Sequence, residues 1–356
     1  MVNLLSDCYA DQCNSAFFGE NPVNKFALTM CFAVALPAFG QTEKPSRLPS
    51  LPNAVTSFGA ATTVDGHLYV YGGHMGDAHK YYKEGQSHTL LRLNLAKPTK
   101  WEKLVNGPGL QGLALVTDGK VLYRVGGFRA MNTKDEDSEL RSQASFAKFD
   151  PRIGKWEELT PLPGPRSSFD AVVHRDQLFV VGGWDMQPEG KNWCKQAYVA
   201  NLKQTPIKWQ KLPDPPFQRR ALSLAAVGDS IYAIGGMKEK GGPTKEVSVF
   251  NIKTQKWSVG PELIGEEAMA GFGSSSFAIG KRLFTSTYEG KVLELSPDGK
   301  KWKQLLALEE GRFFHRMVPM NKSALLLISG ANMETGKYDD IVIVPIDGSR
   351  KTAKVR

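Results

Sequence analysis

Cysteine is scarce in this chain of 356 residues: there are four, and three of them lie within the first 31 positions. Removal of an N-terminal segment would leave Cys194 alone, which excludes an internal disulfide in the mature protein. The chain also lacks any run of 18 or more apolar residues, so the sequence predicts no membrane-spanning helix. Stability is therefore expected to come from the packing of a large core.

Acidic residues are outnumbered, with 36 Asp and Glu against 45 Lys and Arg, which gives a formal net charge of +9. A basic surface favours anionic ligands such as an acidic polysaccharide or an anionic small molecule. The lysines are scattered along the chain rather than clustered, which argues against nucleic acid as a partner. We also expect a monomer.

The N-terminal region resembles an export signal. An apolar stretch covers residues 26–40 and ends in Ala38-Phe39-Gly40, which places small residues before a cut at Gln41. The 25 residues upstream are long and contain acids, unlike a signal peptide, so we interpret the initiation site as Val23. We therefore predict a signal peptide in residues 1–40 and an exported protein, periplasmic or secreted; the alternative is a disordered tail with an apolar patch.

Internal repetition is the strongest pattern in the chain. Four β-rich runs end in Gly-Gly, and their first glycines, at 72, 126, 182 and 235, are 54, 56 and 53 residues apart. Each run is followed by a loop, a third strand and a tryptophan that opens a fourth strand. These tryptophans are Trp101, Trp156, Trp209 and Trp257, and a fifth unit carries Trp302.

Two further units are degenerate. RLFTSTYEG at 282–290 carries Thr-Tyr in place of Gly-Gly, and ALLLISG at 324–330 keeps only Gly330. The near-continuous apolar strands indicate sheets covered on both faces. The last unit has no tryptophan strand, whereas residues 46–52 resemble the ends of the other fourth strands. We therefore predict that this N-terminal segment supplies the outer strand of the sixth sheet and closes a ring.

The Gly-Gly doublets and spaced tryptophans resemble kelch repeats over about residues 47–347. This resemblance implies an all-β fold, a six-bladed β-propeller, which we assign to residues 41–350, followed by a basic tail at 351–356. The family includes actin and degron binders, galactose oxidase and bacterial sialic-acid epimerases, so the fold alone does not decide the function.

Long loops lie on one face of the predicted ring, where each second strand leads to its third: residues 74–88, 128–143, 184–196, 237–245 and 331–339. Function is expected to concentrate in such loops. Trp184 and Trp193 lie in a loop rather than at a repeat position, and exposed aromatics suit sugar rings and protein partners. Phe128 and His74 occupy matching loop positions, and all four side chains are candidate ligand-binding residues.

Three arginines recur at one repeat position. Arg166 and Arg219 each precede the second glycine of their doublet by 17 residues, and Arg312 precedes Gly330 by 18. Guanidinium groups that converge on a channel mouth would suit a carboxylate. The alternative is that each arginine bonds loop carbonyls within its own repeat.

Catalytic residues are not evident. Asp170 and His315 lie in predicted first strands, and Glu266 and Glu267 lie on a turn, so these four are weak acid–base candidates. His74, His79 and His88 share one loop, and Asp135–Glu139 is an acidic run, but neither has the spacing of a metal site. We predict no metal and no cofactor.

Three functions are therefore compared. The first is a binding module for a carbohydrate or an extracytoplasmic protein. The second is an isomerase acting on a sugar acid, resembling N-acetylneuraminate epimerase. The third, a copper oxidase resembling galactose oxidase, needs a tyrosine–cysteine crosslink, for which Cys194 lies in an unsuitable loop. The sequence favours the first.

Overall fold

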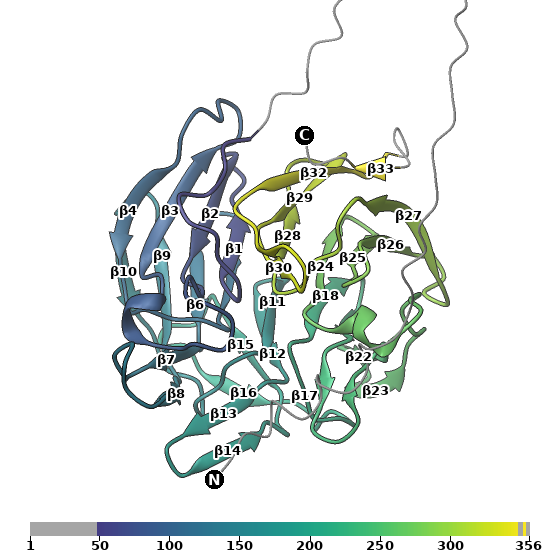
Figure 1. The fold of residues 1–356 in the computed structure, drawn as a ribbon. Helices are drawn as coiled ribbons and strands as arrows, with labels where there is room; N and C mark the ends of the chain where they lie inside the picture. The colour runs from purple at the N-terminus through teal and green to yellow at the C-terminus, as the bar shows by residue number, and fades with distance from the viewer. Residues whose placement is uncertain (1–47, 348–351, 354–356) are drawn as a thin grey trace, which may run out of the picture. The chain divides into compact units, whose positions relative to one another are not determined.

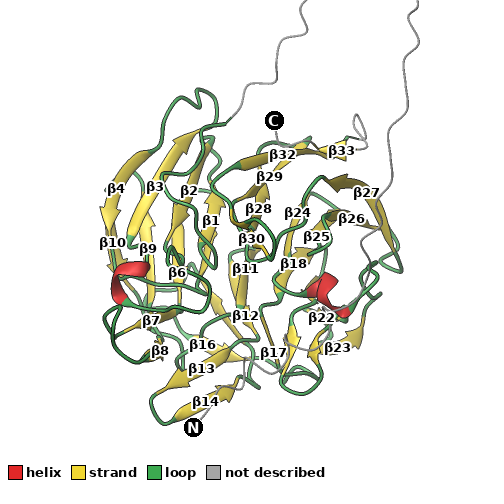
Figure 2. Ribbon diagram, viewed as in Figure 1, coloured by secondary structure: helices red, strands yellow, loops and turns green. Residues whose placement is uncertain are grey.

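The structure is a computed structural model that describes residues 48–347 and 352–353. The described residues are built from β-strands, joined by loops and two short 3-10 turns, η1 (Lys83–Gly85) and η2 (Ala268–Gly271) (Figure 2). The prediction of an all-β fold is confirmed. Within this part of the chain, no helix is long and apolar enough to span a membrane. The predicted signal peptide at 1–40 and most of the basic tail lie outside the described residues.

The strands form antiparallel sheets that follow one another along the chain (Figure 1). The first sheet is β1 (Gly59–Thr62), β2 (His67–Tyr71), β3 (Thr89–Asn94) and β4 (Glu102–Asn106). The second is β5 (Ala114–Thr117), β6 (Leu122–Val125), β9 (Phe146–Asp150) and β10 (Lys155–Glu158). The third is β11 (Asp170–His174), β12 (Gln177–Val181), β15 (Tyr198–Asn201) and β16 (Trp209–Lys211).

The remaining large sheets continue this order. The fourth is β18 (Ser223–Val227), β19 (Ser230–Ile234), β22 (Val247–Asn251) and β23 (Lys256–Val259). The fifth is β24 (Ser275–Ile279), β25 (Arg282–Ser286), β26 (Lys291–Leu295) and β27 (Trp302–Leu308), with β33 (Thr352–Ala353) added in parallel. The sixth is β28 (Arg316–Pro319), β29 (Ala324–Ile328) and β32 (Ile341–Pro345).

The first strand of each sheet contacts the first strands of its two neighbours, in the cyclic order β1, β5, β11, β18, β24, β28 and back to β1. Just before each of these strands lies one residue with a positive φ, between 51° and 60°. We call these six residues the inner ring: Ser57, Gly112, Ser168, Ala221, Gly273 and Phe314. Each N–H donates to the carbonyl of the preceding member, and Ser57 N donates to Phe314 O at 3.2 Å, so the hydrogen bonds run in a cycle.

The glycine doublets connect neighbouring sheets. The second glycine donates its N–H to a carbonyl of the next sheet, as in Gly183 N to Arg219 O at 2.8 Å and Gly236 N to Gly271 O at 2.7 Å. Gly235 has φ of 61°, and a Cβ placed there would lie 2.3 Å from Gly271 O. Only glycine allows this close approach, which is why the doublet recurs.

The repeated tryptophans also join one sheet to the one before it. Trp209 Nε1 donates to Thr160 O, Trp257 Nε1 to Pro213 O, and Trp302 Nε1 to Pro261 O, all within 3.0 Å. Each acceptor lies just after the fourth strand of the preceding sheet. Between the sheets, buried side chains such as Phe179 and Leu224 form the core, so the second strands are covered on both faces as predicted.

The sixth sheet has three strands in the described residues, and residues 48–52 form no strand. They nevertheless occupy the corresponding place. Trp101 Nε1 donates to Pro49 O at 3.1 Å, as Trp209, Trp257 and Trp302 donate to the sheets before theirs. Leu51 N donates to Asp339 O at 2.7 Å, and buried Leu51 packs against the sixth sheet. In the described residues the predicted outer strand at 46–52 is therefore not formed, and residues 46 and 47 lie outside the described part.

The long loops predicted on one face fold mostly as hairpins. They are β7 (Phe128–Ala130) with β8 (Leu140–Ser142), β13 (Trp184–Gln187) with β14 (Gly190–Trp193), and β30 (Ala331–Asn332) with β31 (Gly336–Lys337). In the fourth sheet, β17 (Arg219–Arg220) pairs with β20 (Met237–Lys238), which pairs with β21 (Gly242–Pro243). These hairpins extend their sheets toward the inner-ring side of the channel.

Candidate functional site

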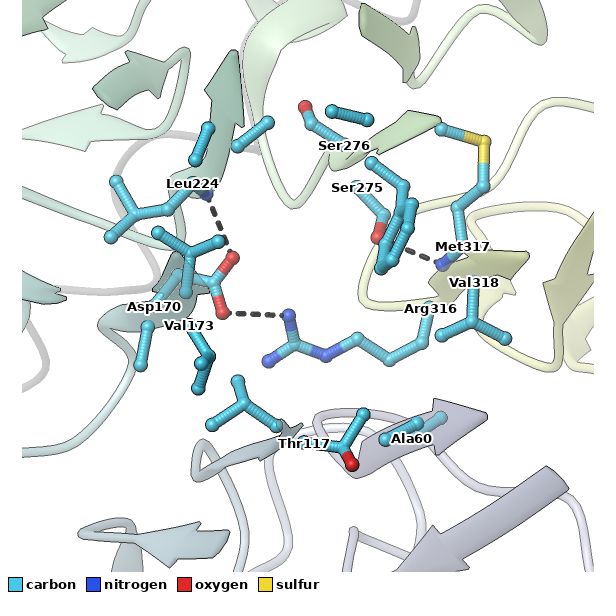
Figure 3. A pocket seen from close by; sticks show the side chains of 18 of the residues that line it. Ala60, Thr117, Asp170, Val173, Leu224, Ser275, Ser276, Arg316, Met317 and Val318 are labelled. Atoms are coloured by element: carbon cyan, nitrogen blue, oxygen red, sulfur yellow. Dashed lines mark hydrogen bonds and ion pairs between the residues drawn. The ribbon is translucent and has the colours of Figure 1, made fainter. Parts of the chain in front are cut away.

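A cavity of about 260 Å³ lies among the first strands of all six sheets. Its closed end is formed by the ion pair between Arg316 and Asp170, whose side chains lie toward each other across the cavity (Figure 3). Arg316 Nη1 donates to Asp170 Oδ1 at 2.9 Å, and Asp170 Oδ2 accepts Leu224 N at 2.8 Å. The carboxylate is thus held by two donors, which suits a structural brace better than an acid–base catalyst.

Arg316 uses its other nitrogens on two further sheets. Its Nε donates to Phe58 O at 3.0 Å and its Nη2 to Leu113 O at 3.1 Å. The guanidinium therefore joins the sixth sheet to the first, second and third, and Asp170 extends the connection to the fourth. On the inner-ring side of Arg316 lies a recess of about 50 Å³, lined by the inner ring together with Phe169, Leu222, Ser274, His315 and Arg316.

His315, the second channel candidate, is buried beneath this recess at 2% exposure. Its Nε2 lies 2.5 Å from Ser286 Oγ, and burial, together with the charges of Arg312 and Arg316, lowers its pKa to about 3. With a pKa of about 3, the imidazole is neutral at neutral pH, so it cannot act there as a general acid.

The three repeated arginines are buried within their own sheets. Arg166 Nη1 donates to Gly182 O at 3.0 Å, Arg219 Nη1 to Gly235 O at 3.0 Å, and Arg312 Nη1 to Ser329 O at 3.2 Å. Arg312 also pairs with Asp340 at 2.6 Å. None of the three lines either cavity described above, so the geometry matches the alternative in which they bond loop carbonyls. Their role in ligand binding stays a prediction.

Trp184 and Trp193 face each other across the β13–β14 hairpin, with ring centroids 5.9 Å apart. Both are half-buried. The guanidinium of Arg220, from the neighbouring sheet, lies 4.2 Å from the centroid of Trp184 and 5.7 Å from that of Trp193. Cations favour the faces of indole rings, so this arrangement positions Arg220 beside two aromatic surfaces.

His74 and Phe128 belong to the same face and are joined through Tyr81. The Tyr81 ring lies 5.0 Å from His74 and 5.8 Å from Phe128. Burial raises the pKa of the Tyr81 hydroxyl, and the positive charge of Arg220 partly offsets this rise. The four candidate residues of the loops are thus linked through Tyr81 and Arg220, two side chains that were not predicted as site residues. We call these six residues the loop-face cluster.

Arg220 is half-buried and differs in its environment from Arg124, Arg219 and Arg312. Burial lowers its pKa to about 10, so the guanidinium is charged at neutral pH. Its Nη2 donates to Met237 Sδ at 2.9 Å, and its Nε has no hydrogen-bond partner. Among residues 48–347, no carboxylate pairs with it. By contrast, Arg219 donates four hydrogen bonds to oxygen, and Arg124 and Arg312 each pair with a carboxylate.

Arg220 was not among the site residues predicted from the sequence. A comparison of the repeats could have identified it. Arg220 directly precedes an inner-ring residue, and the residues at the same position in the first three sheets are Thr56, Gln111 and Ser167. Because the equivalent residues of the other repeats are uncharged, the charge of Arg220 indicates a function specific to this site.

The remaining candidates lie elsewhere. Glu266 and Glu267 are exposed, and their backbone N–H groups donate to Glu289 Oε1. His74 Nε2 bonds Asp77 O at 2.8 Å, which occupies one of its two ring nitrogens. In the described part of the chain, no group of three or more His, Cys, Asp or Glu side chains is placed to hold a metal ion.

Comparison with known proteins supports the repeat assignment. A model of the Kelch motif matches residues 218–264, which span the fourth sheet together with Arg219 and Arg220. Kelch-like protein 35 of Mus musculus is 26% identical over 201 residues, 56% of this chain and 31% of that protein. Kelch-like protein terF of Aspergillus terreus is 27% identical over 54% of this chain and 42% of that protein. Beta-scruin of Limulus polyphemus is 25% identical, over 58% of this chain and 22% of that protein.

This chain therefore spans less than half the length of these relatives. Among solved structures, the one titled "Structure of YjhT" matches with a TM-score of 0.69 at 16% identity, over 86% of this chain and 99% of that one. At that identity the similarity concerns the fold. The motif match at residues 218–264, the related Kelch-like sequences and the recurrent Gly-Gly doublets together support kelch-type repeats in this chain.

Proposed function

We propose that the chain is a binding protein whose loop-face cluster holds an anionic carbohydrate. The observation that carries this proposal is the unneutralised guanidinium of Arg220. Arg220 is half-buried and has no carboxylate partner among residues 48–347. A carboxylate that docks beside this partly desolvated charge would neutralise it and form charge-assisted hydrogen bonds. The half-buried Trp184 and Trp193 provide apolar surfaces on which a sugar ring packs well.

Replacement of Arg220 by methionine tests the proposal. We expect the variant to lose affinity for carboxylated sugars by at least about tenfold, since hydrogen bonds to charged groups contribute roughly 1.5–3 kcal/mol. Binding is measured by NMR titration with glucuronic acid, N-acetylneuraminic acid, glucose and acetate. Lys240→Met is the matched control, because it removes one positive charge from the exposed turn of the same hairpin.

The expected result is that the acids bind the unaltered chain more tightly than glucose, and that only the Arg220 variant loses this preference. The proposal fails if no acid of the panel binds, or if both variants bind like the unaltered chain. A protein partner that binds the same face is the second candidate, suggested by the Kelch-like relatives. If such a partner used the same site, the acids of the panel would compete with it for binding.

We also propose that the six sheets are the blades of one closed ring, with residues 48–52, the described part of the predicted 46–52 segment, lying along the outer edge of the sixth. The hydrogen bond from Leu51 to Asp339 and the tryptophan contact at Pro49 support this proposal. Backbone amide exchange in β32 is the test, since a paired outer edge protects its N–H groups.

Export is proposed from the apolar stretch at 26–40. We expect mass spectrometry of the protein purified from its natural compartment to find a mature N-terminus at Gln41. Retention of residues 1–40 would contradict the proposal. An isomerase acting on a sugar acid is not favoured, because Asp170 is ion-paired, His315 is buried and the two glutamates lie apart from the cavities.

A further inference from the structure

Four aromatic side chains gather at the inner-ring side of the fifth and sixth sheets: Phe272, Phe313, Phe314 and Tyr288. The ring of Phe313 lies 5.0 Å from Phe314, 5.6 Å from Tyr288 in a stacked arrangement, and 6.1 Å from Phe272. Phe314 lines the small recess above Arg316. Tyr288, Phe313 and Phe314 are half-buried, so the cluster is not a fully enclosed core.

Comparison of the six repeats within this one chain shows that these aromatics depart from the pattern. At the inner-ring position of Phe314, the other five sheets carry serine, glycine, serine, alanine and glycine. Tyr288 belongs to the Thr-Tyr pair that replaces a glycine doublet. The chain therefore substitutes large aromatic residues for small ones at the mouth itself, on two adjacent sheets.

The backbone makes the substitution at position 314 costly. Phe314 has φ of 53°, a left-handed conformation that glycine adopts freely and bulky residues disfavour. Residues held in such conformations are strained and concentrate at binding sites. A phenylalanine retained where serine or glycine would be easier indicates that its ring is used.

The aromatic cluster and Arg220 occupy neighbouring positions along the inner ring. Arg220, Phe272 and Phe313 are the residues that precede three consecutive inner-ring members, Ala221, Gly273 and Phe314. Those members are linked by hydrogen bonds, Gly273 N to Ala221 O at 3.1 Å and Phe314 N to Gly273 O at 2.9 Å. The mouth thus has a cationic position at the fourth sheet and an aromatic wall at the fifth and sixth.

We infer that Phe314, with Phe313 and Tyr288, forms a subsite that stacks against the flat face of a ring whose carboxylate is held by Arg220. This inference rests on the proposed binding function and specifies the chemistry of the ligand: a carboxylate joined to a ring with a flat C–H or π face. A sugar acid and an aromatic acid both offer this chemistry.

Phe314→Ser is the test, because serine occupies the same position with the same φ in the first and third sheets. We expect the thermal midpoint to be unchanged or higher, since strain is relieved. The affinity for glucuronic acid is expected to fall about three- to tenfold, in line with the value of one aromatic contact. The affinity for acetate, which carries a carboxylate without a ring, is expected not to change.

Benzoate and glucuronic acid are titrated side by side to separate the two kinds of ring, and each variant is measured well below its own thermal midpoint. Loss of ring-acid binding with acetate binding retained supports the subsite. Unchanged binding of both ring acids in Phe314→Ser overturns it, whatever the stability, and so does an equal loss for acetate. If Arg220→Met abolishes binding and Phe314→Ser does not alter it, the proposed function stands and only this subsite fails.

Discussion

Replacement of Arg316 by leucine is expected to lower the free energy of unfolding by about 3–5 kcal/mol, the usual effect of removing one partner of a buried ion pair. Asp170 is 8% exposed at its side chain and would be left charged inside the channel. The variant would also lose two hydrogen bonds, to Phe58 O and Leu113 O, that join the sixth sheet to the first and second.

Thermal and urea unfolding measure this effect, with an expected fall in midpoint of roughly 10 °C. The double variant with Asp170→Leu is expected to be more stable than Arg316→Leu alone, because no uncompensated carboxylate remains. Arg175→Ala is the control, since its ion pair with Asp229 at 2.6 Å is exposed and such pairs contribute little. Equal stability of Arg316→Leu and the control would contradict a structural role for the Arg316–Asp170 ion pair.

Acid is expected to destabilise the protein through His315. Burial and the neighbouring arginines lower its pKa to about 3, whereas the unfolded chain takes up the proton near pH 6.5. Between these values the unfolded state binds more protons, so this contribution to stability is present above about pH 6.5 and is lost as pH falls toward 3. The slope is about 1.4 kcal/mol per pH unit.

Urea unfolding at pH 7, 5 and 4 measures this slope. Many carboxylates also lose stabilising contacts in acid, so His315→Gln isolates the histidine: its stability is expected to depend less steeply on pH between 6 and 4. If the free energy of unfolding depends on pH with the same slope in the variant and the unaltered chain, His315 does not contribute to the acid destabilisation.

The repeat could be predicted because its constraints are local. A doublet such as Gly235-Gly236 is required where a Cβ would collide with the next sheet, and a tryptophan such as Trp257 is required where one sheet bonds the one before it. Both features recur in four or more of the sheets and so appear as periodicity. The loop residues Trp184 and Trp193 were predicted as a site for the opposite reason, since they interrupt that periodicity.

The arginines show what periodicity cannot decide. Arg166, Arg219 and Arg312 recur as a scaffold residue would, and each bonds its own sheet. Arg220 and Arg316 behave differently, because their contacts come from sheets distant in the chain. Arg220 lies at a position that breaks the repeat, and Arg316 lies across the channel from its partner. Asp170 and Arg316 are 146 residues apart, and no local pattern connects them.

The sequence by itself determined that the chain is all-β, that its units repeat with recurrent Gly-Gly doublets and tryptophans, and that long loops follow the second strands, because glycine geometry and apolar strand runs act within each repeat. Only the tertiary structure decided which charges are neutralised and which are not. The energy of a charged group depends on everything within several ångströms of it, and in a ring of sheets those neighbours come from segments far apart along the chain.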